Sequence, residues 1–135
     1  MTAAALELQK AIFAKLTQSA EIEALMGEAR LFDQAPANAA FPYLTFGRTS
    51  VYDWSTDTES GGEHLVTIHA WSKALGKSEC YALLDAVRNT LNDAALALDG
   101  HVLVRLDAEY SEVRYEDDYD VHHGLARFRA LIDAG

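Results

Sequence analysis

The first part of the chain alternates between apolar and polar positions with the period of an α-helix. This spacing predicts a helix over residues 3–17, with alanine filling the positions between larger apolar side chains. A second, shorter helix is predicted over Ala20–Met26, because Ser19 can accept from free backbone amides at its start and Gly27 can end it. The apolar positions of the first helix are Leu6, Ile12, Phe13 and Leu16.

Much of the remaining chain follows the two-residue period of β-strands. A short edge strand is predicted at residues 29–32, and a longer strand over 41–54, with Pro42 at its start because proline cannot donate to a strand ladder. The polar segment Ser55–Gly62 ends in two glycines and predicts the tip of a hairpin. Further strands are predicted over residues 63–72, 101–115 and 121–133.

One more helix separates the strands into two groups. Residues 77–92 carry a broad apolar stripe, and Ser78 is the expected N-cap. The order α-α-β-β-β-α-β-β predicts a single domain over residues 1–135 with an α+β fold. We expect a mainly antiparallel sheet, or a mixed one, with helices packed on one face.

The apolar positions also predict which strand faces are buried. Both faces of strand 63–72 are partly apolar, so we expect this strand to be central and covered on both sides. Strict alternation in strand 101–115 places Val102, Val104, Leu106, Ala108 and Tyr110 on one face. In the last strand, Ala126, Phe128, Ala130 and Ile132 lie opposite Leu125, Arg127, Arg129 and Leu131.

Composition and charge narrow the class of protein. Hydrophobic residues make up 50% of the 135, which is enough to build a core. Lys and Arg number 11 against 21 Asp and Glu, a net charge of −10, which argues against binding DNA or an anionic membrane through cations. Cys80 is the only cysteine, so the chain forms no internal disulfide and no thiolate metal cluster, as expected in a reducing cytoplasm.

A run of carboxylates and imidazoles at Asp117–His123 is a candidate metal site. Such side chains can hold a divalent cation. Their spacing matches no known ligand pattern, and the adjacent His122 and His123 would point to opposite faces of a strand. We therefore favour a solvated hairpin loop and predict no metal site.

The sequence also contains only weak signals for catalytic residues. Cys80 with His64 or His69 has the chemistry of a nucleophile and base, but a small buried thiol in a core helix is the favoured interpretation. The chain has neither a phosphate-binding loop nor the motif of a serine hydrolase. The sequence therefore predicts no enzyme and no cofactor.

Charge is concentrated in one segment. Asp107–Asp120 holds seven acids and one base, a net charge of −6 in 14 residues. It forms a solvated surface, a face that repels phosphate, or a face that docks a basic partner. Arg127 and Arg129 share one face of the last strand, and we slightly favour their pairing across the hairpin with Glu112 or Glu116 over pairing across a subunit interface.

Several short motifs occur in an order that resembles one family. Phe41–Tyr43 opens a strand after the helix pair, and His69–Ser72 ends the next strand. Gly76, Glu79 and the helical segment Leu83–Val87 follow. This order, over nearly the whole chain, resembles the tail completion (tail terminator) proteins of siphovirus-like particles and gene transfer agents, most of all the gene-transfer-agent branch.

The resemblance implies a structural role and no catalytic residues. It implies a ring, typically hexameric, that caps the tail tube, joins it to the head–tail connector or stopper protein, and lets DNA pass without specific binding. Such a protein is cytoplasmic during assembly and then part of the particle, at the head-proximal end of the tail. The alternative from the residues alone is a monomeric or dimeric small-molecule-binding domain or an unassigned enzyme.

Within such a ring, three features are expected to make contacts. Tyr52 and Trp54 lie near a strand end, where burial within one subunit is hard to complete, so at least one of them is expected to pack on a neighbour. The polar hairpin Ser55–Gly62 is expected to act in assembly. Glu116, Asp117 and Asp118 are expected to face the channel or a partner.

Overall fold

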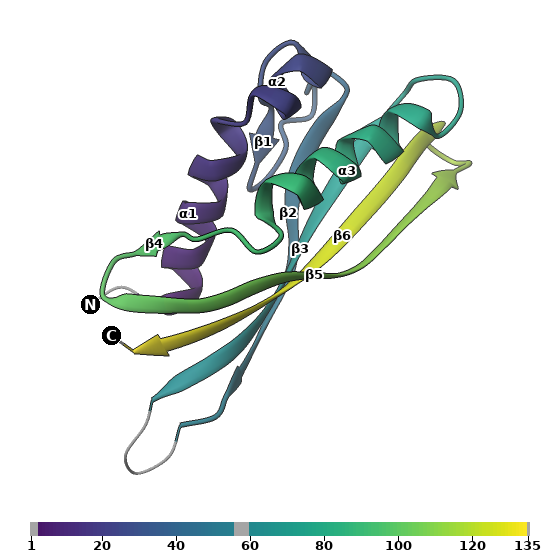
Figure 1. Ribbon diagram of the computed structural model, residues 1–135. Helices are drawn as coiled ribbons and strands as arrows, with labels where there is room; N and C mark the ends of the chain where they lie inside the picture. The colour runs from purple at the N-terminus through teal and green to yellow at the C-terminus, as the bar shows by residue number, and fades with distance from the viewer. Residues whose placement is uncertain (1–2, 56–59, 135) are drawn as a thin grey trace.

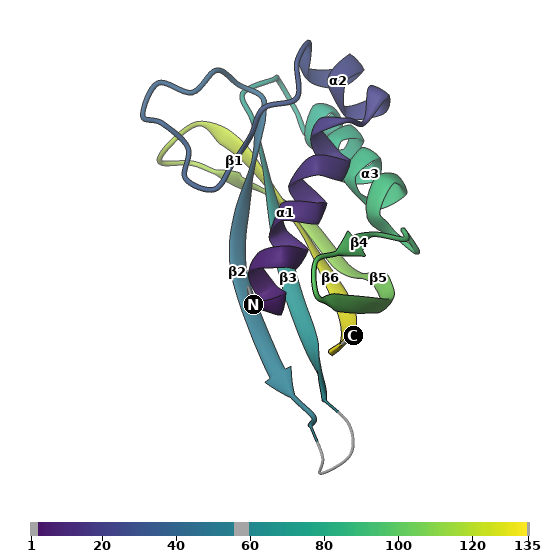
Figure 2. The ribbon, with the colours of Figure 1, turned by 90° about the vertical axis from the view of Figure 1, so that its left-hand side faces the viewer.

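In the computed structural model, which describes residues 3–55 and 60–134, three helices lie against one face of a six-stranded sheet (Figures 1 and 2). The helices are α1 (Ala4–Thr17), α2 (Ala20–Met26) and α3 (Ser78–Leu91). The Ser19 hydroxyl accepts from the Ile22 N–H, and Gly27 ends α2 with φ of 82°, as predicted. Lys77, and not Ser78, occupies the N-cap position of α3.

The sheet is mixed, and its spatial order is β1-β2-β3-β6-β5-β4. β1 runs parallel to β2, and every other neighbouring pair is antiparallel. The predicted α+β class is confirmed, while the two-residue β4 was too short to be predicted. The strands are β1 (Leu31–Phe32), β2 (Tyr43–Asp53), β3 (Gly61–Ser72), β4 (Ala97–Leu98), β5 (His101–Glu116) and β6 (Val121–Ala134).

The core lies between the helix layer and the sheet. From β6 it receives the four alternating residues predicted from the sequence, among them Phe128, which is fully buried. Ile68 of β3 pairs with Ala126, and Ala70 with Gly124, so β3 is central as expected. The helices contribute the apolar residues Leu8, Ile12, Leu16, Ile22, Leu83, Val87 and Leu91.

The predicted alternation of β5 is wrong in detail. Its register shifts twice, between Leu103 and Arg105 and again between Ala108 and Tyr110. Each irregularity adds a residue to one strand and so inverts the faces of the residues that follow. Leu106 is buried, whereas Val102 and Val104 are exposed.

The expectation that both faces of β3 are covered is also wrong for the described part of the chain. No helix covers its second face in Figures 1 and 2. The proposed assembly segment Ser55–Gly62 includes residues 56–59, which lie outside the described residues; β2 and β3 pair as far as Asp53 and Gly62. None of the described helices is long and apolar enough to cross a membrane.

Candidate functional site: the open face of the sheet

The face of the sheet opposite the helices, here called the open face, carries most of the distinctive side chains. Because strand residues alternate between faces, the pairing register fixes its members. They are Tyr43, Thr45, Arg48, Ser50 and Tyr52 of β2; Glu63, Leu65, Thr67, His69 and Trp71 of β3; Arg105, Asp107, Tyr110, Glu112, Arg114 and Glu116 of β5; and His123, Leu125, Arg127, Arg129 and Leu131 of β6.

Aromatic rings stack at one end of the open face. The rings of Trp71 and His123 are nearly parallel, with centroids 4.0 Å apart and an interplanar angle of 6°. The Trp71 indole N–H donates to Thr45 Oγ1 at 3.0 Å, which fixes the orientation of the ring. Tyr43 extends the stack on the β2 side. The result is an aromatic surface in which Tyr43 and Trp71 are half-buried and His123 is buried.

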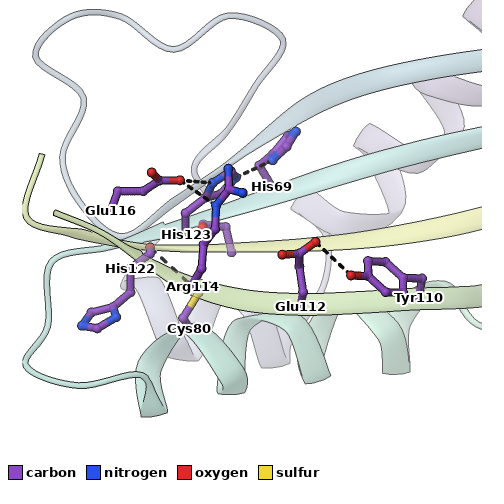
Figure 3. Close-up of polar contacts among 9 residues, drawn as sticks. His69, Cys80, Tyr110, Glu112, Arg114, Glu116, His122 and His123 are labelled. Atoms are coloured by element: carbon purple, nitrogen blue, oxygen red, sulfur yellow. Dashed lines mark hydrogen bonds and ion pairs between the residues drawn. The ribbon is translucent and has the colours of Figure 1, made fainter. Parts of the chain in front are cut away.

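A chain of polar contacts runs through this stack (Figure 3). Arg114 Nε donates to Glu116 Oε1 at 2.8 Å, and His123 Nδ1 lies 3.1 Å from the same oxygen. His69 Nδ1 lies 2.6 Å from His123 Nε2. Since a carboxylate only accepts, His123 donates through Nδ1, so its Nε2 accepts from His69 when both rings are neutral.

The environment fixes the charges in this polar chain. Burial lowers the pKa of His69, and the nearby charges of His123 and Arg114 lower it further. Hydrogen bonds from His123 and Arg114 lower the pKa of Glu116. At neutral pH Glu116 is therefore ionised and His69 is neutral. In these states Glu116 accepts from His123 and His69 donates to His123, so the hydrogen bonds hold the His123 ring in its orientation.

Cys80 and His69 lie on opposite sides of the sheet (Figure 3). Cys80 is fully buried beneath β6, and burial raises the pKa of its thiol to about 11. A thiol with this pKa stays protonated at neutral pH and is a poor nucleophile. The favoured interpretation of a buried structural thiol is confirmed.

The two histidines of the candidate metal site also lie on opposite faces of the sheet. His123 joins the aromatic stack on the open face, while the ring of His122 lies beside Tyr115, on the other face. Among the described residues, no group of three or more His, Cys, Asp or Glu side chains is placed to hold a metal ion. The predicted opposite orientation of the two histidines is the physical reason.

A shallow hollow of about 420 Å³ occupies the middle of the open face. Its lining includes Arg48 of β2 and Arg127 of β6. The Arg127 guanidinium lies 5.3 Å from the centre of the Tyr110 ring. Arg48 makes no hydrogen bond or ion pair within the described part of the chain. An acidic protein thus presents two arginines without carboxylate partners at the centre of one face.

The expected pairing of Arg127 and Arg129 with the hairpin glutamates is wrong. Arg129 forms an ion pair with Glu63 of β3, and Arg127 stacks on Tyr110. Glu112 accepts from the Tyr110 hydroxyl at 2.9 Å. The bulge between Ala108 and Tyr110 explains this difference, because it sets an aromatic ring opposite Arg127.

The two predicted interface aromatics are exposed. Tyr52 is 58% exposed and Trp54 is 40% exposed, at the end of β2. The Trp54 indole lies over Gly61, where an added Cβ would come within 2.1 Å of Nε1. This position leaves part of each ring available to another molecule.

The predicted acidic residues lie at the opposite end of the sheet (Figure 1). Glu116 ends β5, and its carboxylate is engaged by Arg114 and His123. Asp117 and Asp118 are exposed in the turn that leads into β6. The contact between His69 and His123 could not be predicted from the sequence, because it depends on which strands are neighbours. The alternation at His122 and His123 predicted only that these two rings lie on opposite faces.

Comparisons with known proteins agree with this fold. Residues 10–133 match the family described as "Tail completion protein gp17". Among solved structures, the chain is similar to a chain of the "Virion of native gene transfer agent (GTA) particle", with 29% sequence identity and a TM-score of 0.89 over 98% of this chain and 99% of that chain. No curated protein matches the sequence.

Proposed function

The chain belongs to the tail completion protein family, and from this premise we propose that it is the subunit of a hexameric ring that caps the tail tube and joins it to the head–tail connector or stopper protein. Family membership gives it a structural role in a phage-type tail. The observation that carries the proposal is the likeness in fold, over nearly the full length of both chains, to a component of a gene transfer agent virion.

Surface features of the chain support a ring built from identical contacts. A head-to-tail contact joins two different surfaces of one subunit and closes into a ring when the rotation permits. Tyr52 and Trp54 offer aromatic area at one end of β2, and aromatic side chains are favoured in interface centres. Arg127 and Arg129 lie further across the same open face, and we assign all four to contacts with a subunit or partner.

The charge of the chain suits a channel through which DNA passes without specific binding. With a net charge of −10, the protein lacks the excess of cations that grips phosphates. We assign Glu116, Asp117 and Asp118 to the channel wall or to the surface that faces a basic partner. The ring forms in the cytoplasm and then enters the particle at the head-proximal end of the tail.

The chemistry of the described side chains supports a non-enzymatic role. The buried Cys80 thiol is protonated at neutral pH, and the polar chain of His69, His123 and Glu116 is used to orient rings. We therefore assign no catalytic residue, cofactor or metal to the protein.

Imaging of intact particles tests this function. A chain carrying a small tag should decorate the head-proximal end of the tail as a ring, and averaging should resolve its symmetry. Particles made without the gene should lack this ring and carry tails of uncontrolled length or no joined tails. Normal particles without the protein, or a tag found elsewhere, would contradict the proposal.

A further inference from the structure

Both edges of the sheet leave long stretches of strand without a neighbour. β1 pairs with β2 only at Leu44 and Thr45, so β2 has no outer strand over residues 46–53 within the described chain (Figure 2). At the other edge, β4 pairs with β5 only at His101 and Val102. The turn after α3 covers Leu106 and Ala108, and residues 109–116 have no described strand beside them (Figure 1). Unpaired backbone of this kind is a template for another strand.

The backbone groups along the two edges have matching orientations. Trp54 directs its N–H to Gly61 of β3, and successive strand residues alternate, so Val51 and Asp53 direct theirs away from β3. On β5, Ala108 donates away from β6, to Asn92 Oδ1. After the bulge, alternation directs the amides of Ser111, Val113 and Tyr115 away from β6 as well. On both edges, these outward amides belong to residues whose side chains face the helix layer.

Strand direction matches too. Neighbours are antiparallel throughout β2-β3-β6-β5, so β2 and β5 run in opposite directions. If β5 of one copy lies beside β2 of the next, the new pair is again antiparallel, with the helix layers of both copies on the same side. The free stretches lie toward opposite ends of the sheet, so pairing needs a shift along the strands. Closed barrels accommodate such a shift by tilting their strands.

Side chains along the edges are complementary. Val51 is 51% exposed on the β2 edge, and Val113 lies on the same face of β5. Arg48 lacks a partner in the described structure, while β5 presents Glu112 and Glu116 on the open face. A register with Arg48 opposite Arg114 sets like charges together, which is unfavourable. The neighbouring registers place Arg48 opposite Glu112 or Glu116.

We infer that the free edge of β5 in one copy adds antiparallel to the free edge of β2 in the next copy, so that the sheets of successive copies form one continuous sheet around the ring. The occupant of each edge is therefore a second copy of this chain, with Arg48 opposite a glutamate of β5. This inference rests on the proposed ring function and names the surfaces that close the ring.

A proline at the β2 edge tests the pairing. Val51→Pro removes one backbone donor that has no partner strand among the described residues of the subunit, and proline is tolerated at such edge positions. Val51→Ala is the matched control, since it removes the side chain and keeps the N–H. We expect both purified variants to unfold at closely similar denaturant concentrations. Val51→Pro should weaken each subunit contact by about tenfold and leave tails without rings, while Val51→Ala should form rings.

Cysteine pairs give a second measurement that does not depend on proline. The two favoured registers place Ser50 opposite Tyr110 or Arg114. We expect an intersubunit disulfide in assembled rings for Ser50→Cys with Tyr110→Cys or for Ser50→Cys with Arg114→Cys, and none for Ser50→Cys alone. Rings that form normally with Val51→Pro, or without a cross-link in either pair, overturn the edge pairing and leave the ring itself intact. Wild-type tails without a ring overturn the proposed function instead.

Discussion

His69 and His123 illustrate how single residues on the open face are constrained. His69 Nδ1 lies 2.6 Å from His123 Nε2, and the Trp71 ring stacks on the face of the His123 ring. A proton added to His123 at Nε2 would remove the acceptor of this hydrogen bond, because an imidazolium ring donates from both nitrogens. The contact therefore requires a free lone pair on His123 Nε2, toward which His69 donates from Nδ1.

Acid should weaken the fold through His69 and His64, the two histidines whose pKa is lowered by burial. Burial keeps the pKa of folded His69 below about 6.5, the ordinary value for the unfolded chain, so the unfolded chain binds the proton more readily. The stability contribution is thus complete above pH ~6.5 and is lost as the pH falls toward the folded pKa. His64, whose pKa is lowered mainly by burial, acts in the same direction.

Urea unfolding at several pH values between 7.5 and 5 measures this effect. The free energy of unfolding should fall through this range in the wild-type protein. In His69→Gln the fall should be smaller, with a remainder that His64 explains. Thr67→Ser, on the same face and without a titrating group, serves as the control. An unchanged pH dependence in His69→Gln would assign the effect to other groups.

Trp54 offers a prediction that separates subunit contact from folding. Its ring is 40% exposed and packs over Gly61, so truncation removes little core. Trp54→Ala should weaken ring formation while the melting temperature of the isolated subunit changes by only a few degrees. Phe128→Ala is the contrasting variant, because Phe128 is fully buried and its loss should destabilise the subunit by ~3–5 kcal/mol. A large drop in subunit stability in Trp54→Ala would place its main role in folding.

At the scale of elements, α3 lies close to β6 at one glycine. A Cβ added to Gly124 would come within 2.7 Å of Cys80 Sγ and 2.9 Å of Leu84 Cδ1. Real Cβ atoms do not approach other atoms so closely, so a side chain here would force the helix away from the sheet. This one glycine therefore sets how closely the first turns of α3 approach β6.

Gly124→Ala should lower the free energy of unfolding by ~1–3 kcal/mol through overpacking. Removing the sulfur should relieve the strain, so the Cys80→Ala change should be less costly in the Gly124→Ala background than in the wild type. A double-mutant cycle of urea unfolding curves measures this coupling. Additive effects of the two changes would contradict a direct clash between them.

The sequence predicted most elements because their apolar periods are regular. The limits of α2 and the faces of β6 follow directly from capping residues and two-residue alternation. The bulges in β5 were not predictable, since an extra residue leaves the local composition unchanged. The prediction that the open face of β3 is covered is wrong. Alternation shows that Leu65 and Trp71 share one face of the strand, but it does not show whether the same chain or another molecule covers that face. The candidate site residues could be named from the sequence, but the residues that they contact could not, because those contacts depend on which strands are neighbours in the sheet.

At the scale of the whole molecule, the acidic turn and the two exposed aromatics of β2 lie at opposite ends of the sheet. Tyr52 and Trp54 lie toward the end where β2 leads into β3, and the turn with Asp117 and Asp118 lies at the other end (Figure 1). A hexameric ring would repeat this acidic turn six times around its axis. At ~0.15 M salt the screening length is ~8 Å, so these carboxylates act on DNA only if they lie on the channel wall itself.

Reversing the charge of this turn distinguishes a channel wall from a docking surface. Asp117→Lys with Asp118→Lys leaves Glu116, which orients His123, unchanged; Asp117→Asn with Asp118→Asn is the matched control without added cations. If the turn lines the channel, lysine particles should assemble but deliver DNA poorly, because the new cations hold the phosphates, and the defect should shrink as salt is raised. Asparagine particles should deliver DNA nearly normally. Failure of the lysine variant to join heads and tails would identify the turn as a docking surface for a basic partner, and normal delivery would exclude it from the channel.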